Sequence, residues 1–377
     1  MPTMQQVMAS VEASAELGFK PAGSYRFGEA DLIEATRLLL NADRMPRHKH
    51  RYHMEEAITT SDFPYLFGVM IDRELLARYR TAGTDFWPYC RRLRASNFNA
   101  HTLDRLDGLS EPLDRVGQKG EYLVGVLGDK HYTFQVFKRG RQLDISWESI
   151  INDGMGAFTD IPQRMSDSAI NTDAYQVTSL YASATGPNAL MFGAAIDGID
   201  NVGVLPLTIP NLQTVMSDMA QQPDPQTGLP MGVRGAHLVV PPALEWDART
   251  LLTSSHVQYT EVGAGAGIPV GTSSVIPQMG LQLHVNPWLP VVDVSGDVDT
   301  TWYLFADGSQ GNAMGYGYLN GHESPEICMK ATNKVLPSGA PISQFSGDFE
   351  TDNIFYRVRV VVGGTQLDPR FAFANVG

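Results

Sequence analysis

The stretch that decides the predicted fold runs from residue 120 to residue 184. It reads GEYLVGVLGDKHYTFQVFKRGRQLDIS (residues 120–146) and continues as WESIINDGMGAFTDIPQRMSDSAINTDAYQVTSLYASA (residues 147–184). In the first part, apolar or aromatic side chains alternate with polar or small ones, which is the pattern of β-strands. The sequence Gly-Asp-Lys at residues 128–130 can form a turn between two such strands. We therefore predict a long two-stranded β-hairpin with Lys130 near its tip.

The second part of this stretch predicts two helices. Ser146 precedes a short helix, WESIIND, which two glycines end. A long helix is expected over residues 158–184, with Thr159 as its candidate N-cap. Its apolar stripe, at steps of three and four residues, consists of Ile170, Ala174, Val177 and Tyr181. A long hairpin beside one long helix has little core of its own, so the stretch indicates a protein that contacts neighbouring molecules.

The whole chain has 377 residues, enough for two or three domains with sizeable cores. Its net charge is −13, and that charge is unevenly distributed. Residues 1–187 carry 21 basic and 24 acidic side chains, whereas residues 188–377 carry 7 basic and 17 acidic ones. A typical DNA-reading domain presents a basic surface instead. The acidic half would repel DNA and other acidic surfaces.

Catalytic, targeting and membrane-spanning signatures are missing from the sequence. It contains no phosphate-binding loop motif, no HExxH motif and no nucleophile elbow. No apolar run approaches the ~20 residues of a membrane span, and the N-terminus lacks the pattern of a secretory signal. The two cysteines, Cys90 and Cys328, are far apart, which favours free thiols while leaving a disulfide open. We expect no enzyme activity and no cofactor.

The remaining elements are predicted from periodicity and capping residues. In the N-terminal part, helices are expected over residues 29–41 and 63–80, an extended segment over 84–100, and a polar connection over 101–119. In the C-terminal half, Thr208 caps a helix, residues 233–240 form a buried strand, and Pro241-Pro242 starts another helix. The short strands expected after it lie within residues 281–290, 300–307, 313–321 and 354–362.

Two motifs allow a metal-binding interpretation beside a plainer one. The sequence HKHRYH (residues 48–53) has three imidazoles that could bind zinc, or it is a solvated basic linker. The sequence DVSGDVD (residues 293–299) could bind calcium, although its spacing does not match an EF-hand. The plainer interpretation, a surface segment without metal, is favoured for both. We therefore expect no metal site.

Two further motifs raise the question of phosphate or nucleotide binding. The sequence RRLR (residues 91–94) could contact phosphates or be the solvated face of a strand. The sequence GNAMGYG (residues 311–317) superficially resembles a dinucleotide loop, but it lacks the preceding strand and the following helix. A glycine-rich turn between strands is the favoured interpretation of the second motif.

The predicted hairpin carries a basic excess on an acidic molecule. Between Arg115 and Arg141 there are six basic side chains and two acidic ones. The plain interpretation is a solvated ribbon, but an isolated hairpin is marginally stable and its open edges invite pairing. A second copy of the chain would satisfy both the charge and the edges, which favours a homo-oligomer. The candidate contact residues are Lys130, His131, Lys138, Arg139 and Arg141.

The order of these blocks resembles a known family. The hairpin is followed by LDISWESIINDGMGAFTDIPQRM, then by AHLVVPPALEWDARTLL and finally by YRVRVVVGGTQLDPR. This order is similar to that of the major capsid proteins of tailed bacteriophages (the Hong Kong 97-type fold), from about Thr59 onward. Some members cross-link a loop lysine to an asparagine of a neighbour. The cross-link also needs a glutamate, and no matching asparagine or glutamate is identified here, so we expect Lys130 to make non-covalent contacts. The resemblance is to members with unprocessed N-termini, so we expect the N-terminus to stay uncleaved.

The resemblance implies an α+β capsid fold with four parts. They are an N-terminal arm with helices (residues 1–115), an extended β-hairpin loop (116–145), a peripheral domain with the long spine helix (146–189 and 346–377), and an axial domain (190–345). The stripe of the spine helix would be Ile170, Ala174, Val177 and Tyr181.

The resemblance also implies a structural function. The protein would self-assemble into pentamers and hexamers of an icosahedral head shell that encloses double-stranded DNA. Its other partners would be a portal protein and scaffold or decoration proteins, with no membrane contact, and assembly would take place in the cytoplasm of the bacterial host. An encapsulin-like nanocompartment shell of the same fold is the alternative. A hydrolase or sugar-binding protein is a third hypothesis, but the sequence shows no convergent polar site for it.

Overall fold

The computed structural model describes residues 79, 85–108, 111–125, 127–146, 156–193, 198–254, 256–259, 270–273, 276–330, 332–338 and 347–377. The predicted helices at 29–41 and 147–153 lie outside these residues, and so does the histidine-rich motif at 48–53. Of the predicted helix 63–80, only Tyr79 is described, and it is helical.

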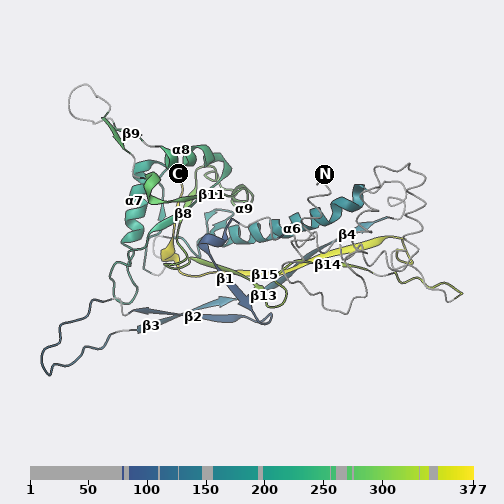
Figure 1. The fold of residues 1–377 in the computed structure, drawn as a ribbon, viewed down its shortest axis with the longest axis horizontal. Helices are drawn as coiled ribbons and strands as arrows, with labels where there is room; N and C mark the ends of the chain where they lie inside the picture. The colour runs from purple at the N-terminus through teal and green to yellow at the C-terminus, as the bar shows by residue number, and fades with distance from the viewer. Residues whose placement is uncertain are drawn as a thin grey trace, which may run out of the picture. The chain divides into compact units, whose positions relative to one another are not determined.

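The described part of the chain has a mixed α+β structure, whose elements are labelled in Figure 1. In chain order, with η for a 3-10 helix, they are η2 (Trp87–Tyr89), β1 (Cys90–Ala95), β2 (His101–Gly108), β3 (Leu127–Phe134), β4 (Phe137–Ile145), α6 (Gly156–Tyr181), β5 (Ala182–Ser183), β6 (Gly186–Pro187), β7 (Val202–Gly203), α7 (Ile209–Ala220), β8 (Gly235–Val240), η3 (Pro242–Leu244), α8 (Glu245–Thr253), β9 (His256–Tyr259), β10 (Val270–Ser273), η4 (Ile276–Met279), β11 (Gln282–Val285), α9 (Leu289–Val292), β12 (Trp302–Ala306), β13 (Met314–Leu319), β14 (Glu326–Met329), β15 (Ile354–Gln366), η5 (Pro369–Phe371) and β16 (Ala372–Asn375).

The chain divides into two compact units, which we describe separately. The first unit comprises Met1–Gly83, Lys138–Asn171 and His322–Val361. The second unit comprises Thr84–Phe137, Thr172–Gly321 and Val362–Gly377. Helix α6 and strand β15 contribute residues to both units.

A five-stranded sheet in the order β11-β8-β12-β16-β7 forms the core of the second unit. All five residues of β12 are buried, as are most of those of β8, because both strands are covered on both faces. Helix α7 contacts β16. Helix α8 contacts β11, and both are labelled in Figure 1. The predicted cap of α7 is confirmed, since the Thr208 hydroxyl accepts a hydrogen bond from the Asn211 backbone N–H at 3.4 Å.

Strands β1 and β13 and the end of β15 form a second sheet region in the second unit. Strand β1 runs parallel to β13, and residues 362–366 of β15 run antiparallel to β13. A Cβ on Gly317 would lie 2.1 Å from the carbonyl oxygen of Leu93, so only glycine allows this close approach. Residues 311–313 of the glycine-rich motif belong to the connection between β12 and β13, as predicted, whereas Gly315 and Gly317 lie inside β13 itself.

The predicted hairpin between residues 120 and 145 is wrong. Strand β3 does not pair with β4. It pairs antiparallel with β2, from His101 opposite Phe134 to Gly108 opposite Leu127. The predicted turn residues lie inside β3, where Lys130 faces Arg105 across the ribbon. The predicted polar connection over residues 101–119 therefore contains a strand, because its charged side chains find partners instead of facing solvent as a loop.

The passage from β3 to β4 explains why no turn forms there. Only Gln135 and Val136 separate the two strands, and Val136 is fully buried. The Gln135 carbonyl oxygen packs against Gly363, where a Cβ would lie only 2.0 Å away. Exposed turns need room and solvent for their polar backbone groups, and this tightly packed site has neither.

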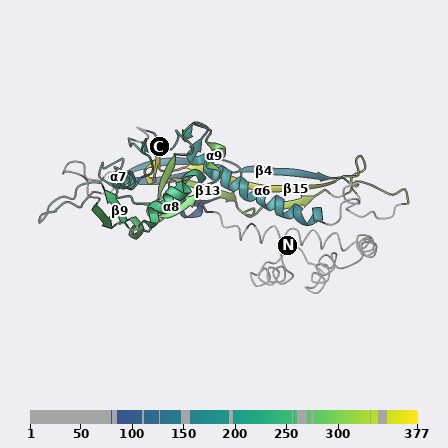
Figure 2. The same ribbon diagram turned by 90° about the horizontal axis from the view of Figure 1, so that it is seen from above.

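Strands β4 and β14 and the start of β15 form the described sheet of the first unit. Both β4 and β14 pair with β15, and β4 lies alongside β15 in Figure 2. Along β15, Tyr356 and Val358 are buried whereas Arg357 is exposed, which confirms the predicted alternation. Gly140 lets β4 approach closely, since a Cβ there would lie 2.5 Å from the Val358 carbonyl oxygen.

Helix α6 confirms the predicted long helix but shifts its buried stripe. The helix spans residues 156–181 rather than 158–184. Val177 and Tyr181 are buried as predicted, whereas Ile170 and Ala174 are only half-buried. The residues just before them, Ala169 and Asp173, are buried instead.

The cause of this shift is a buried carboxylate. Asp173 accepts hydrogen bonds from the hydroxyls of Tyr316 at 2.8 Å and Tyr318 at 3.4 Å. These bonds make burial of a charged side chain acceptable. A search for apolar stripes cannot find such a residue.

Candidate functional site

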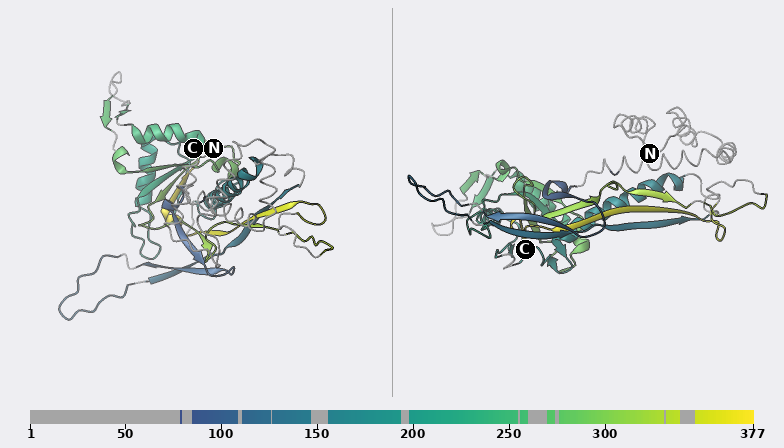
Figure 3. Two further views of the ribbon diagram at one scale, coloured as in Figure 1. Left: turned by 45° about the vertical axis from the view of Figure 1, so that its right-hand side comes forward. Right: turned by 90° about the horizontal axis from the view of Figure 1, so that it is seen from below.

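The ribbon of β2 and β3, with the loop that joins them, is the candidate functional site. Its strands are connected by residues 109–126, of which 111–125 are described, and Figures 1 and 3 show residues 111–125 reaching out beyond the strands, away from helix α8 of the same unit. The loop contains a tight turn, in which the Gly120 backbone N–H donates to the Gly117 carbonyl oxygen at 3.0 Å.

The loop exposes large apolar side chains, which we call the apolar tip. Leu113 is 100% exposed, Val124 94%, Tyr122 83% and Leu123 77%. Apolar groups gathered in this way on one segment usually mark a surface that a partner covers. The geometry therefore indicates a contact surface.

One face of the ribbon is exposed to solvent and carries polar side chains beside two exposed leucines, Leu106 and Leu127. His131 of β3 contacts Asp104 of β2 at 2.7 Å and Asp129 at 3.2 Å. The hydrogen bond with Asp104 raises the pKa of His131, and the charge of Asp104 adds to the effect. Cross-strand pairs of this kind favour the observed register.

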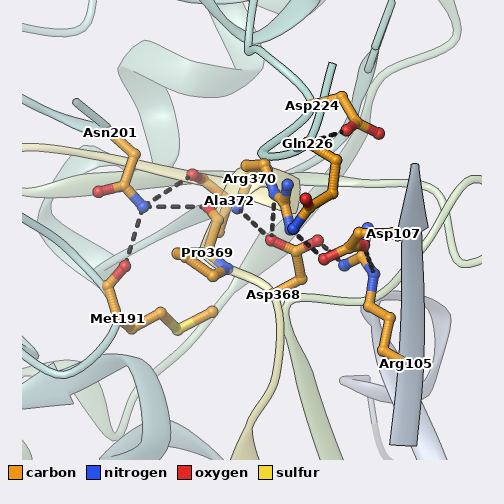
Figure 4. Close-up of polar contacts among 10 residues, drawn as sticks. All are labelled: Arg105, Asp107, Met191, Asn201, Asp224, Gln226, Asp368, Pro369, Arg370 and Ala372. Carbon is orange, nitrogen blue, oxygen red and sulfur yellow. Dashed lines mark hydrogen bonds and ion pairs between the residues drawn. The ribbon is translucent and has the colours of Figure 1, made fainter. Parts of the chain in front are cut away.

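On the other face of the ribbon, two charged side chains of β2 meet two charged side chains at η5, and we call these four residues the ion cluster (Figure 4). Its members are Arg105, Asp107, Asp368 and Arg370. The Nε of Arg105 lies 2.7 Å from Asp107, and a second nitrogen of Arg105 pairs with Asp368. The Nε of Arg370 lies 2.8 Å from Asp368, and its other end lies 3.5 Å from Asp107. The cluster thus alternates two positive and two negative groups around a closed set of contacts.

The ion cluster is largely shielded from water. Asp368 and Arg370 are each 1% exposed, and Asp107 is 7% exposed. The guanidinium of Arg105 lies 5.3 Å from the centre of the Phe371 ring. Burial lowers the pKa of Arg105, and the neighbouring charge of Arg370 adds to this, while Asp107 opposes it. Since the four formal charges cancel, the cluster can be buried without a net charge.

Asn201 holds the backbone that carries this cluster (Figure 4). Its fully buried side-chain amide donates to the carbonyl oxygens of Met191 at 2.9 Å, Pro369 at 3.0 Å and Ala372 at 3.3 Å. Its side-chain oxygen accepts from the Gly193 N–H at 3.0 Å. One asparagine therefore fixes the turn before β16 to the segment that follows β6.

The predicted contact residues are divided between the two units. Lys130 and His131 lie in β3 of the second unit, whereas Lys138, Arg139 and Arg141 lie exposed in β4 of the first unit. Lys130 is half-buried within the strand, 5.5 Å from the centre of the Tyr132 ring, so its predicted place at the tip is wrong.

The other motifs receive plain structural roles. The RRLR motif lies in β1, where its three arginines are exposed and Arg92 lies 5.3 Å from the centre of the Trp87 ring. Asp293 accepts from the Ser295 N–H at 2.9 Å, and among the described residues no group of His, Cys, Asp and Glu could hold a metal ion. Cys90 and Cys328 are free. No helix within the described ranges could cross a membrane.

Sequence reasoning missed the apolar tip and the ion cluster. The run YLVGVL predicts the first strand of a hairpin, although a short run rich in apolar residues is also compatible with an exposed contact loop. Arg105 and Asp107 have the spacing of one strand face, which was the available signal. Their partners in the sequence DPR lie more than 260 residues away, and no local pattern links the two.

Comparison with known proteins identifies the family. A family model described as "Phage capsid protein" matches residues 131–375, which is more than half of the chain. The chain therefore belongs to the phage capsid protein family. It is a major capsid protein that forms the phage head shell, a structural protein of the virion and not an enzyme. The match begins inside β3, so β2 and the apolar tip lie outside it.

Solved phage structures are similar at low sequence identity. A chain from Mycobacterium phage Adephagia is 12% identical with a TM-score of 0.46, covering 78% of this chain and 90% of that one. A chain from Gordonia phage Cozz is 15% identical with a TM-score of 0.44, covering 79% of this chain and 85% of that one. A chain of a structure described as "Capsid of native GTA particle computed with C5 symmetry" is 10% identical with a TM-score of 0.45, covering 77% of this chain and 88% of that one. No curated protein matches the chain in sequence. The family assignment rests on the family model.

Proposed function

We propose that this capsid protein assembles with copies of itself into pentamers and hexamers of an icosahedral shell that encloses double-stranded DNA, and that the apolar tip is a main contact between copies. The exposed tip is the observation that carries the proposal. A two-stranded ribbon has too little core to bury these side chains itself. Since each copy carries both the tip and the surface that receives it, the contact is heterologous and can build a closed shell.

The four-part division of the chain stays a proposal, with the extended loop redrawn. The loop becomes the β2–β3 ribbon, residues 101–134, in place of residues 116–145, and the N-terminal arm ends before residue 101. Helix α6 with β4, β14 and β15 supports a peripheral domain, and the sheet around β8 and β12 supports an axial domain. Register and burial of β2 and β3 support the new loop boundaries.

A second contact is proposed for the basic strand β4. Lys138, Arg139 and Arg141 are exposed there, whereas the second unit carries 10 basic and 20 acidic side chains. Opposite charges on two surfaces steer copies into register and weaken as salt rises. Portal, scaffold or decoration proteins and packaged DNA, bound without sequence preference, are the further partners, and assembly takes place in the cytoplasm of the bacterial host.

The test replaces Tyr122, Leu123 and Val124 by serine together. We expect folded subunits with an unchanged circular dichroism spectrum but no shells by electron microscopy and analytical ultracentrifugation. The matched control Gln118→Ser, in the same loop, should form normal shells. Normal shells from the triple variant would contradict the contact role of the tip.

The molecules enclosed in the shell distinguish a phage head from a nanocompartment. Shells recovered from phage-infected cells should protect double-stranded DNA from nuclease. Shells that hold only protein cargo would favour the encapsulin-like alternative.

A further inference from the structure

The ion cluster sits where the ribbon leaves the body of the second unit. Arg105 and Asp107 lie near the end of β2, which ends at Gly108, directly before the loop. Their partners, Asp368 and Arg370, belong to the turn at η5 that Asn201 holds in place. The cluster therefore ties the end of β2 to a rigid part of the same unit (Figure 4).

The opposite strand is held at the same level. Gly128 of β3 faces Asp107 in the register, and it packs against the side chain of Gln226, since a Cβ there would lie 2.2 Å from the Gln226 amide nitrogen. Gln226 is itself fixed, because the Asp224 carboxylate accepts from its backbone N–H at 2.9 Å and from that of Thr227 at 3.1 Å. Both strands are thus clamped one residue pair before the loop begins.

The cost of the ion cluster indicates a geometric role. Replacing buried ion pairs by apolar side chains is often neutral or stabilising, so such pairs are poor stabilisers. The pairing here is also incomplete, because one terminal guanidinium nitrogen of Arg370 has no hydrogen-bond partner within the described residues. What charged pairs supply better than apolar contacts is a defined direction, since a guanidinium and a carboxylate bind in few orientations.

We propose that Arg105, Asp107, Asp368 and Arg370, together with Gln226, are positioning residues that set the direction in which the loop leaves the second unit. The clamp presents the apolar tip to a second copy in one orientation, which lowers the entropy cost of docking. This inference rests on the proposed contact role of the tip. Loss of the clamp leaves the subunit folded and the tip intact but no longer aimed.

The experiment measures the direction of the loop directly. Gly117→Cys in the loop and Gly296→Cys in the body of the second unit are suitable label sites, because a Cβ at either position meets nothing within 4 Å. Cys328→Ser removes the exposed thiol, and Cys90 is buried. Nitroxides on the two new cysteines of the full chain, diluted with unlabelled protein, report the distance distribution within one chain by double electron–electron resonance.

The variant Arg105→Met keeps an apolar stem near Phe371 and removes both ion pairs of Arg105. We expect its distance distribution, measured well below the unfolding temperature, to be about twice as wide as that of the parent and its shell yield to fall about ten-fold. Its thermal unfolding midpoint should also fall, because the buried carboxylates of Asp107 and Asp368 are left with Arg370 as their single counter-charge. Arg105→Lys keeps the charge but not the two-nitrogen geometry of the guanidinium, so it should restore the thermal unfolding midpoint more fully than the narrow distribution. The matched control Arg115→Met removes an exposed arginine of the same loop and should change neither.

The outcomes separate this inference from the proposed function. An unchanged distribution in Arg105→Met overturns the clamp, whatever the shell yield. A wide distribution with normal shell yield also overturns it, because direction then does not matter for assembly. If Arg105→Met does not fold, Gln226→Ala, which removes no charge, is measured with the same expectations. Failure of the tip itself is read from the serine triple variant, which leaves the clamp intact.

Discussion

Strands β3 and β4 follow each other with two residues between them, yet they differ in pairing, burial and surroundings. Strand β3 pairs with β2 and has one half-buried face, whereas β4 pairs with β15 and is exposed at every residue from 137 to 144. The two strands also belong to different units. Two neighbouring strands that look like one hairpin in the sequence therefore serve two structural purposes, one as an anchored support of a loop and one as an exposed basic edge.

This comparison of β3 and β4 shows that strand pairing depends on the available partner and not on distance along the chain. A hairpin needs an exposed turn, and Val136 is fully buried between the two strands. Strand β2 offers eight residues in register with β3, so the longer loop 109–126 is accepted. The entropy cost of closing a longer loop grows only slowly with its length.

The largest effect on stability is expected from a substitution next to Gln135, where the chain passes from β3 to β4. In Gly363→Val, the new side chain would occupy the space of the Gln135 carbonyl oxygen, 2.0 Å from the Cβ position. We expect stability to fall by about 3 kcal/mol or more in urea unfolding followed by circular dichroism. The control Gly117→Ala, where a Cβ meets nothing within 4 Å, should change little. An unchanged midpoint for Gly363→Val would show that the crossing is not tightly packed.

A smaller effect is expected where the anchored strand meets its support. Asn201→Ala removes the amide that binds three carbonyl oxygens and leaves those groups buried. We expect a loss of about 2 kcal/mol in the same unfolding measurement and faster amide hydrogen exchange in residues 369–375. The exposed control Asn99→Ala should leave both unchanged. Unaltered exchange would mean that η5 is held by other contacts.

The pH dependence of stability sharpens the contrast between buried and exposed histidines of the second unit. His237 is buried, with its Nδ1 3.1 Å from the Nε2 of His284, while Asp85, Tyr89 and Asp307 are the other titratable groups around this pair. Burial lowers the pKa of His237, and His284 lowers it further, while Asp307 opposes this. The unfolded chain therefore takes up the proton first, so stability should fall as pH drops below about 6.5 and level off below the folded-state pKa.

Thermal unfolding between pH 8 and pH 5 checks this sign, with His237→Gln as the test variant. The variant should flatten the decrease toward acid pH. His131 has the opposite sign, because its raised pKa contributes stability at low pH that is lost as pH rises through the folded-state value. His131→Gln should therefore leave the acid decrease in place or deepen it. A parent protein equally stable at pH 5 and pH 8 would contradict the prediction.

The smallest effect on stability is expected at β4. Arg141→Glu should change the free energy of unfolding by less than about 0.5 kcal/mol, because the residue is exposed. Its shell assembly should weaken, most at low salt, if β4 meets an acidic surface. Arg234→Glu is the control for an exposed arginine outside β4. Equal assembly of both variants at every salt concentration would leave β4 as a solvated strand.

The sequence predicted those parts of the fold that depend on interactions between residues close together in the chain. Thr208 begins α7 because its hydroxyl satisfies a backbone N–H one turn ahead. The strands β8 and β12 were found from short runs of apolar residues, and the long helix from its period. The stripe of that helix was placed one residue off at two positions, because Asp173 is buried by hydrogen bonds that only the fold supplies.

The candidate site was predicted only in outline. The strand pairing and the tip of the predicted ribbon are wrong, since β3 pairs with β2 and the predicted turn lies inside β3. The contact role of the predicted residues stays a prediction. The alternation of β3 and β4 is the same whether they pair with each other or with other strands. Residues 101–119 have the composition of a polar connection, yet Arg105 and Asp107 of β2 are held by Asp368 and Arg370.

The amino-acid sequence alone predicts the class of this protein: an acidic α+β chain with one long helix, a packed sheet and a segment too poor in core to stand alone. Periodicity, caps and apolar runs act over a few residues, so they can be recognised without the fold. That β2 is the partner of β3, and that an ion cluster anchors the ribbon, is known from the folded structure and not from the sequence. Those contacts join residues up to 263 positions apart, and they exist only where folding brings the four charges together and excludes water.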